Sequence, residues 1–369
     1  MKRLLCLIFL LPLFTFSVFA EGTDNYTAYY NDSGLQALEK IVPEEVADTL
    51  EELEIDLASY SSILNLDKNS FISLIKSYFT NGFKAPLTAS VLCIGLLVMC
   101  AAVSGMWSKQ LQMSETYTYV CMLSLVTVIL LPFVNSCTAL ISASKSISVF
   151  MLSFIPIFSG VLVMAGNVTL SSVYSGIMLI VADGITTALS FFVSPAILIY
   201  ISLGIASVLS GIDGAYLLTT RIKTAVNWIL GFIMTIFSGL LSIQTAVAKA
   251  ADNLAIKTTK FLIGSTVPVA GGPLGEALTT VTASMGILRT AAMSWCLVVI
   301  AIIILPPLIE LCLWRVCLCL LSSVAHFLSL PDAAKLLDVC SAAAGLIFAV
   351  ILTVTAIFII SLGVLGGVG

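Results

Sequence analysis

The stretch Phe261-Leu-Ile-Gly-Ser-Thr-Val-Pro-Val-Ala-Gly-Gly-Pro-Leu-Gly-Glu-Ala-Leu278 is apolar enough for membrane depth, yet it is rich in residues that break helices. Its prolines, Pro268 and Pro273, remove backbone donors, and its four glycines loosen the backbone that remains. Because lipid cannot satisfy free backbone groups, broken backbone at that depth must be buried in protein or line a wet cavity. The pattern predicts a broken, re-entrant segment over residues 261–283, with an ordinary loop between two helices as the alternative.

The chain around this stretch has the composition of a membrane protein. Its 369 residues are 59% hydrophobic and only 10% charged, whereas soluble proteins average about 25% charged residues. Eight apolar segments have lengths close to the ~20 residues that a bilayer requires. They are 86–107, 117–137, 147–166, 172–193, 195–211, 226–248, 291–313 and 341–366. The sequence therefore predicts an all-α, polytopic helical membrane domain over residues 85–369.

The first twenty residues have the pattern of a secretory signal peptide. Lys2 and Arg3 precede an apolar run from Leu4 to Phe16, and Val18-Phe-Ala20 supplies small residues for cleavage. An uncleaved first membrane anchor is the alternative. The lysines and arginines of the loops do not fix the orientation of the body, because an exported front and eight spans place five on each side.

Residues 21–84 form an acidic segment, which a signal peptide would export. The segment holds 12 acidic residues and 4 lysines. Pro43-Glu-Glu45 suits the first turn of a helix, and a further helix is expected from Asp67 or Asn69 to Asn81-Gly82, lying on the membrane surface or on the body. Apolar residues at spacings of three and four form one stripe, which packs within the segment or docks a partner. They are Leu35, Leu38, Val42, Val46, Leu50, Leu53 and Leu57.

The ten cysteines do not suggest an exported disulfide framework, and three that cluster do not suggest a metal site. The acidic segment has none, and the nine beyond the leader lie in or beside predicted membrane helices. Cys312, Cys317 and Cys319 cluster without an acidic or histidine set at ligand spacing, so small apolar core residues are expected there. No catalytic motif or paired carboxylates at a defined spacing occur in the chain. We therefore expect no enzyme, no cofactor and no metal, and the charge is not basic enough for nucleic acid.

A few residues in the apolar body are candidates for a transport pathway or for helix packing. Asp183 interrupts an apolar helix, where a carboxylate is costly and usually faces the bundle interior or water. It is interpreted as an ion or proton site, or as a paired structural acid. Glu310 is expected to pair with Arg315 or with another helix, and Asp252 forms an i,i+3 pair with Lys249. The candidate set is Asp183, Asp252, Lys260, Gly264, Pro268, Gly271, Gly272 and Glu276.

Several motifs in the second half of the chain resemble those of the stage III sporulation protein AE family of endospore-forming bacteria. They are Phe237-Ser-Gly239, Asp252, Thr258-Thr-Lys260-Phe261, Gly264 and Val267-Pro-Val-Ala-Gly-Gly272. The order of leader, exported helical segment and polytopic body is similar too. The family tends to continue from the double glycine into a Ser-Asp pair, whereas this chain reads Pro273-Leu-Gly275-Glu276. That departure puts a specific role for this position in doubt.

The resemblance implies a biological role rather than a chemistry. Its members act in the mother-cell membrane that surrounds the forespore, as membrane-embedded parts of a multi-protein channel with relatives in secretion systems. They are needed for late forespore gene expression. The implied partners are other stage III sporulation membrane proteins and the lipid bilayer, and a homo-oligomer is left open. The alternatives are a stand-alone secondary permease and a membrane scaffold.

Overall fold

The computed structural model describes residue 30 and residues 34–59, 68–106, 111–210, 213–266 and 271–366. Across these ranges the regular structure is entirely helical, with no strand, so the predicted all-α fold class is confirmed. The predicted signal peptide over residues 1–20 lies outside the described residues.

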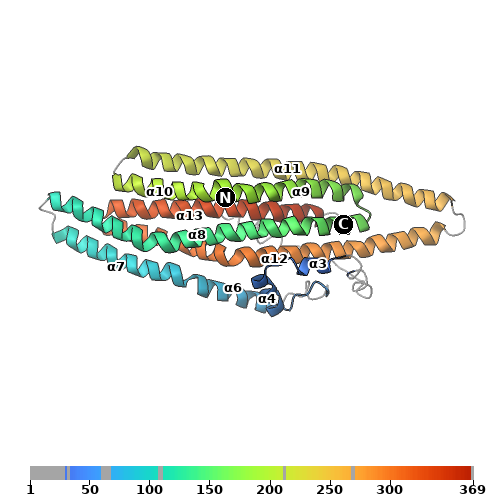
Figure 1. The fold of residues 1–369 in the computed structure, drawn as a ribbon, viewed down its shortest axis with the longest axis horizontal. Coiled ribbons are helices and arrows are strands. Elements are labelled where there is room, and N and C mark those ends of the chain that lie inside the picture. Colours follow the sequence, from blue (N-terminus) through green and yellow to red (C-terminus); the bar gives the residue numbers. More distant parts are fainter. Residues whose placement is uncertain are drawn as a thin grey trace.

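Long helices lie side by side in an elongated bundle (Figure 1). In chain order, the first long helices of the bundle are α6 (Lys68–Gly82), α7 (Lys84–Met106) and α8 (Leu111–Met164). The chain continues through α9 (Val168–Ala188), the π-helical turn η1 (Leu189–Val193), α10 (Ser194–Ser210), α11 (Asp213–Thr266), α12 (Gly271–Phe327) and α13 (Pro331–Gly366). Among the described residues, six helical stretches are long and apolar enough to cross a membrane.

Two of the breaks expected between membrane spans are helical in the structure. The segments 117–137 and 147–166 both belong to α8, which is one helix of 54 residues. The polar residues there are accommodated within the helix, because Ser144 and Ser148 donate their hydroxyl hydrogens back to the carbonyls of Leu140 and Ser144. A helix of that length measures about 80 Å, well beyond the roughly 30 Å hydrocarbon core of a bilayer.

The segments 172–193 and 195–211 also follow each other without a loop. The turn η1 joins α9 to α10, directly before Pro195. Proline has no N–H to donate to the preceding turn, and such positions are accommodated by a local wide turn. The six candidate spans therefore run Ile72–Ser104, Tyr119–Met164, Val168–Ser210, Leu218–Leu262, Ser284–Phe327 and Pro331–Leu365.

Tight turns with a left-handed residue reverse the chain at both ends of the bundle. After α8, Gly166 has a φ of 81°, and the N–H of Asn167 donates to the Leu162 carbonyl over 2.9 Å. After α12, Ser329 takes the same place with a φ of 57°, and Pro331 then opens α13. Both are Schellman-type ends, which satisfy the last helical carbonyls before the chain turns. From Pro331 the helix α13 runs without a break for 36 residues.

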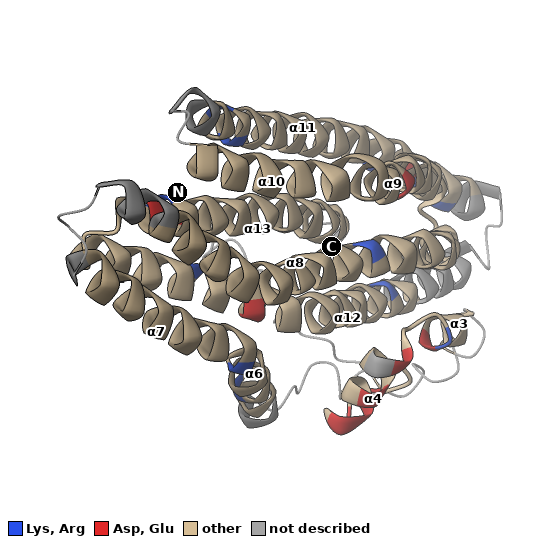
Figure 2. Ribbon diagram, turned by 60° about the vertical axis from the view of Figure 1, so that its left-hand side comes forward, with Lys and Arg blue, Asp and Glu red and all other residues tan. Residues whose placement is uncertain are grey.

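The acidic segment docks on the bundle. Its helices α3 (Gln36–Glu39) and α4 (Glu44–Glu52) contact α8 and α12 respectively, and α6 lies along α12, as one of the sequence-based alternatives predicts. Leu35, Leu38 and Leu57 of the predicted stripe are fully buried. Figure 2 shows the acidic residues gathered on α3 and α4, in contrast to the largely uncharged bundle.

The bundle buries its helices unequally. In an apolar 18-residue stretch of each helix, 56% of the residues are buried in α13 but only 11% in α11. The exposed side of α11 carries large apolar side chains, including Trp228, Ile243 and Phe261. A face of this kind is covered by lipid or by another membrane protein, whereas α13 is the centre of the fold.

Candidate functional site

Asp252 joins two helices through a pair of backbone hydrogen bonds. Its carboxylate, only 3% exposed, accepts the N–H of Thr169 over 2.9 Å and the N–H of Leu170 over 2.8 Å. These donors belong to the first turn of α9, where Asn167 provides no side-chain cap. The first N–H groups of a helix have no partner within it, and the positive end of the helix dipole favours an anion. Asp252 of α11 thus caps α9 from outside.

This cap replaces the surface ion pair expected from the sequence. Lys249 and Asp252 do not meet, and the one ion pair seen in the described part of the chain joins Lys335 to Asp332 over 3.9 Å. Because both oxygens of Asp252 are used inside the bundle, the residue is suited to positioning α9 against α11 rather than to moving a proton or an ion.

Glu310 of α12 is held by a second buried network. Ser136 of α8 donates its hydroxyl hydrogen to Glu310 Oε1, and the indole N–H of Trp314 donates to Ser136 Oγ over 2.9 Å. Trp314 is 1% exposed and meets Phe133 edge-on at 5.8 Å between ring centroids. Of the two predicted partners for Glu310, the structure therefore selects another helix over Arg315.

A polar cavity of about 320 Å³ lies between α11, α12 and α13. Its charged residues are Lys223 of α11, Arg315 of α12 and Asp338 of α13. Each lies a few helical turns from the end of the bundle that carries the α10–α11 and α12–α13 connections, at the left of Figure 1. The sequence patterns did not reveal this group, since its members are far apart in the chain. The sequence did contain one indication: each of the three charged residues lies a similar number of residues from an end of an apolar helix.

The remaining candidate residues are spread over the molecule. Asp183 is exposed on α9, and Lys260 is half-buried on α11. Gly264 lies in the last turn of α11, whereas Gly271, Gly272 and Glu276 lie in the first turns of α12. Pro268 lies outside the described residues. The predicted re-entrant stretch thus divides between the end of one long helix and the start of the next, and its role as a pathway stays a prediction.

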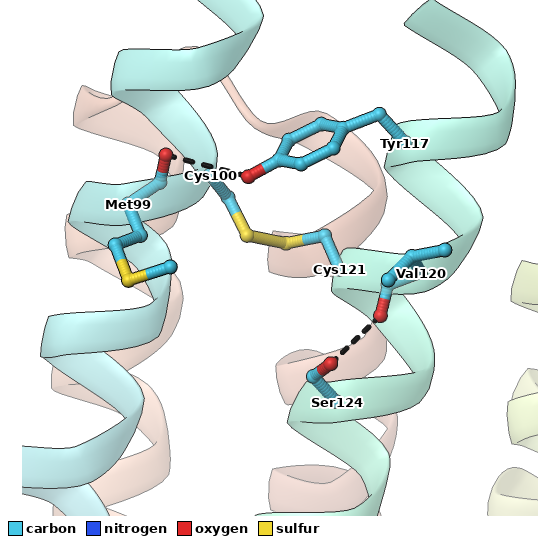
Figure 3. Close-up of a disulfide and its surroundings, with 6 residues drawn as sticks. All are labelled: Met99, Cys100, Tyr117, Val120, Cys121 and Ser124. Carbon is cyan, nitrogen blue, oxygen red and sulfur yellow. Dashed lines mark hydrogen bonds between the residues drawn. A yellow bond between two sulfur atoms is a disulfide. The ribbon is translucent and has the colours of Figure 1, made fainter. Parts of the chain in front are cut away.

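One pair of cysteines in the helical body forms a disulfide that the sequence analysis did not predict. Cys100 of α7 and Cys121 of α8 are bonded to each other, with their Cα atoms 6.2 Å apart, as Figure 3 shows. They are 21 residues apart in sequence, and only the close approach of α7 to α8 reveals the pairing. In the other cluster Cys317 is buried as predicted, but Cys312 and Cys319 are exposed.

The structure places no recognisable metal centre in the residues that it describes, where no three His, Cys, Asp or Glu side chains come together. The polar groups that it does bring together serve helix capping, a buried hydrogen-bond network and the cavity. They can hold helices in register and bind a charged ligand.

Comparison with known proteins gives a consistent picture. The family model described as stage III sporulation protein AE matches residues 57–369. A curated relative, "Stage III sporulation protein AE" of Bacillus subtilis (strain 168), is 25% identical over 224 residues. That match covers 60% of this chain and 56% of the relative, so the chain aligns with little more than half of the relative's length. No solved structure matches the chain.

Proposed function

Because this chain belongs to the stage III sporulation protein AE family, we propose that it is a membrane-embedded component of the channel complex between mother cell and forespore. A role in sporulation follows from the family, and the six long apolar stretches fit a multi-pass membrane protein. The proposed location is the mother-cell membrane around the forespore. The proposed consequence is late forespore gene expression, which depends on the complex.

The observation that carries this proposal is the family match over most of the chain. The shape of the bundle supports a component of a larger assembly. The outer side of α11 is broadly apolar, and Asp183 lies exposed on the neighbouring α9. A carboxylate that faces hydrocarbon alone is costly, so a second protein against this side would supply it with a partner.

The acidic surface of α4 and the turn after it offers a site for partner proteins. Glu51, Glu54 and Asp56 are exposed there, while the apolar residues beneath them are buried against the bundle. The docking leaves Glu51 and Glu54 on the surface, where their carboxylates can meet basic surfaces of other stage III sporulation membrane proteins, and complementary charge speeds such encounters. We place this surface between the two membranes, on the exported side of the mother-cell membrane.

The stand-alone permease and the scaffold are the competing proposals. The permease hypothesis takes Asp183 as part of its binding site, but Asp183 is exposed on a single copy. Asp252 is buried, yet both of its oxygens are taken by α9. A scaffold requires no pathway and is separated from a channel component only by experiment.

The test is affinity purification of the tagged, full-length protein from sporulating cells after mild solubilisation. We expect the other stage III sporulation membrane proteins to co-purify. The triple variant Glu51→Lys, Glu54→Lys, Asp56→Lys should lose at least some of them while still inserting in the membrane. The matched control is Lys335→Gln, a change of exposed charge on α13. A protein that purifies alone and transports a solute in vesicles by itself would refute the channel proposal and favour the permease.

A further inference from the structure

The cavity between α11, α12 and α13 contains a cation that nothing in the described part of the protein neutralises. Arg315 is half-buried and lines the cavity, and within the described ranges no carboxylate forms an ion pair with it. The acid nearest to it in sequence, Glu310, is bound to Ser136 instead. A half-buried guanidinium in an apolar bundle requires hydrogen-bond acceptors, because its desolvation is otherwise uncompensated.

The backbone of α13 is shaped to admit this guanidinium. A Cβ atom at Gly345 would lie 3.2 Å from Cζ and 3.3 Å from Nη1 of Arg315. The guanidinium therefore packs against the bare backbone of Gly345, and an alanine there would shift it by a few tenths of an ångström. This contact restrains the Arg315 guanidinium at the cavity, so less side-chain conformational entropy is lost when a ligand binds.

The other groups at the cavity make it a donor-rich, positively charged site. Lys223 adds a second cation. Among the described lining residues the carboxylate is Asp338, which lies at the exposed rim, and its Oδ1 accepts a hydrogen bond from Ser322 over 2.6 Å. These described residues thus contribute two cationic side chains and one carboxylate to the cavity. Four hydroxyl groups complete the polar lining, and they belong to Tyr200, Thr219, Thr220 and Ser341.

We propose that this cavity binds a phosphate-class oxyanion, carried either by an anionic lipid headgroup or by free phosphate. The planar fork of Arg315 donates two parallel hydrogen bonds to two oxygens of such a group, and Lys223 contributes a point charge. Hydroxyl groups supply further donors. Basic pockets between membrane helices are known places for phosphorylated headgroups. The site is independent of the channel role, so either proposal can fail without the other.

The experiment uses the purified full-length protein and two probes. The first probe is inorganic phosphate, titrated into lipid-free detergent micelles at constant ionic strength with chloride as the balancing ion. The second is phosphatidylglycerol, supplied in vesicles and compared with vesicles of phosphatidylcholine alone. Binding is read from the rise in thermal unfolding midpoint, because a ligand that binds only the folded state raises it, and by native mass spectrometry of retained lipid. Stabilisation by phosphate alone identifies the free ion, and retention of phosphatidylglycerol alone identifies the headgroup; either supports the proposal.

The variants separate this site from general surface charge. Arg315→Gln should weaken binding of the active probe about tenfold, the loss expected for one charge-assisted contact. Arg315→Lys keeps the charge but loses the fork, and Gly345→Ala keeps the arginine but displaces it, so both should also weaken binding even if Arg315→Gln fails to fold. Lys335→Gln removes an exposed charge from α13 and should have no effect. The proposal is overturned if neither probe binds, or if Lys335→Gln weakens binding as much as the Arg315 variants.

Discussion

The bundle contains two kinds of polar site, and they differ in whether their charges are satisfied by the fold. Where Asp252 meets α9, one buried carboxylate accepts two backbone hydrogen bonds, one at each oxygen. In the cavity near the opposite end, the half-buried Arg315 has no ion pair among the described residues. The closed site is therefore expected to contribute to stability, and the open site to ligand affinity. Acidic character in an apolar helix does not by itself distinguish the two.

The largest effect is expected from breaking the closed site. Asp252→Ala leaves the N–H groups of Thr169 and Leu170 buried without a partner, and each such group costs about 1–3 kcal/mol. We expect a total loss of about 2–6 kcal/mol in the free energy of unfolding, measured in detergent micelles. Asp252→Asn keeps one acceptor oxygen and should lose roughly half as much.

Asp183→Asn provides the matched control for that substitution. It removes a carboxylate from an exposed position on α9, a residue for which the described structure shows no hydrogen bond. The unfolding free energy of the isolated protein should stay within about 0.5 kcal/mol of the wild type. Equal losses from the two acids would contradict the distinction between satisfied and exposed carboxylates.

The second prediction concerns the helix contact beside the open site. A Cβ atom at Gly204 of α10 would lie 2.2 Å from Cγ1 of Val339, a residue that lines the cavity. Gly204→Ala should therefore cost about 1–3 kcal/mol through overpacking. Val339→Ala in the same chain should recover part of the loss, and a double-mutant cycle of unfolding free energies measures the coupling.

Gly231→Ala on α11 is the control for this contact, because nothing lies within 4 Å of the added methyl group. Since alanine favours helix more than glycine does, this variant should be neutral or more stable by up to about 1 kcal/mol. A loss at Gly231 comparable to that at Gly204 would show that helix contact is not the cause.

The sequence predicted the helices better than it predicted which side chains would interact. Periodicity and apolar content identified the helical class, the start of α4 after Pro43 and the end of α6 at Gly82. Local rules then assigned Asp252 to Lys249 and Glu310 to Arg315 or another helix, although the actual partners lie 83 and 174 residues away. Spacing along one helix cannot reveal which helices become neighbours, and for the same reason it missed the bond between Cys100 and Cys121.

One of the predicted span boundaries was wrong because a polar stretch can be either a loop or part of a helix. Serine-rich stretches such as 142–148 resemble loops in a hydropathy profile, because their side chains are polar. In a helix, however, serine can donate back to the carbonyl four residues earlier, as Ser144 and Ser148 do here. The hydropathy pattern alone does not decide between these outcomes, and the break predicted between 137 and 147 is continuous helix in α8.

The third prediction applies to the network around Glu310, a further closed site. Ser136→Ala removes the acceptor of the Trp314 indole N–H and the donor to Glu310 in one step. We expect a loss of about 1–2 kcal/mol in the unfolding free energy, since two polar groups lose a partner at a partly buried position. Ser136→Thr keeps the hydroxyl and should lose less. If the loss of these hydrogen bonds lowers the stability, the emission maximum of the Trp314 indole should shift in the alanine variant and not in the threonine variant.

The smallest effect is expected where both charges are exposed. Lys335 and Asp332 of α13 form an ion pair of 3.9 Å with side-chain exposures of 51% and 49%. Water screens such pairs and side-chain entropy opposes them, so Lys335→Gln should change the unfolding free energy by no more than about 0.5 kcal/mol. High salt should erase even that difference. A loss as large as that of Asp252→Ala would mean that exposed charge on α13 stabilises the fold as strongly as the buried cap on α9, and burial would then no longer explain which polar groups the bundle depends on.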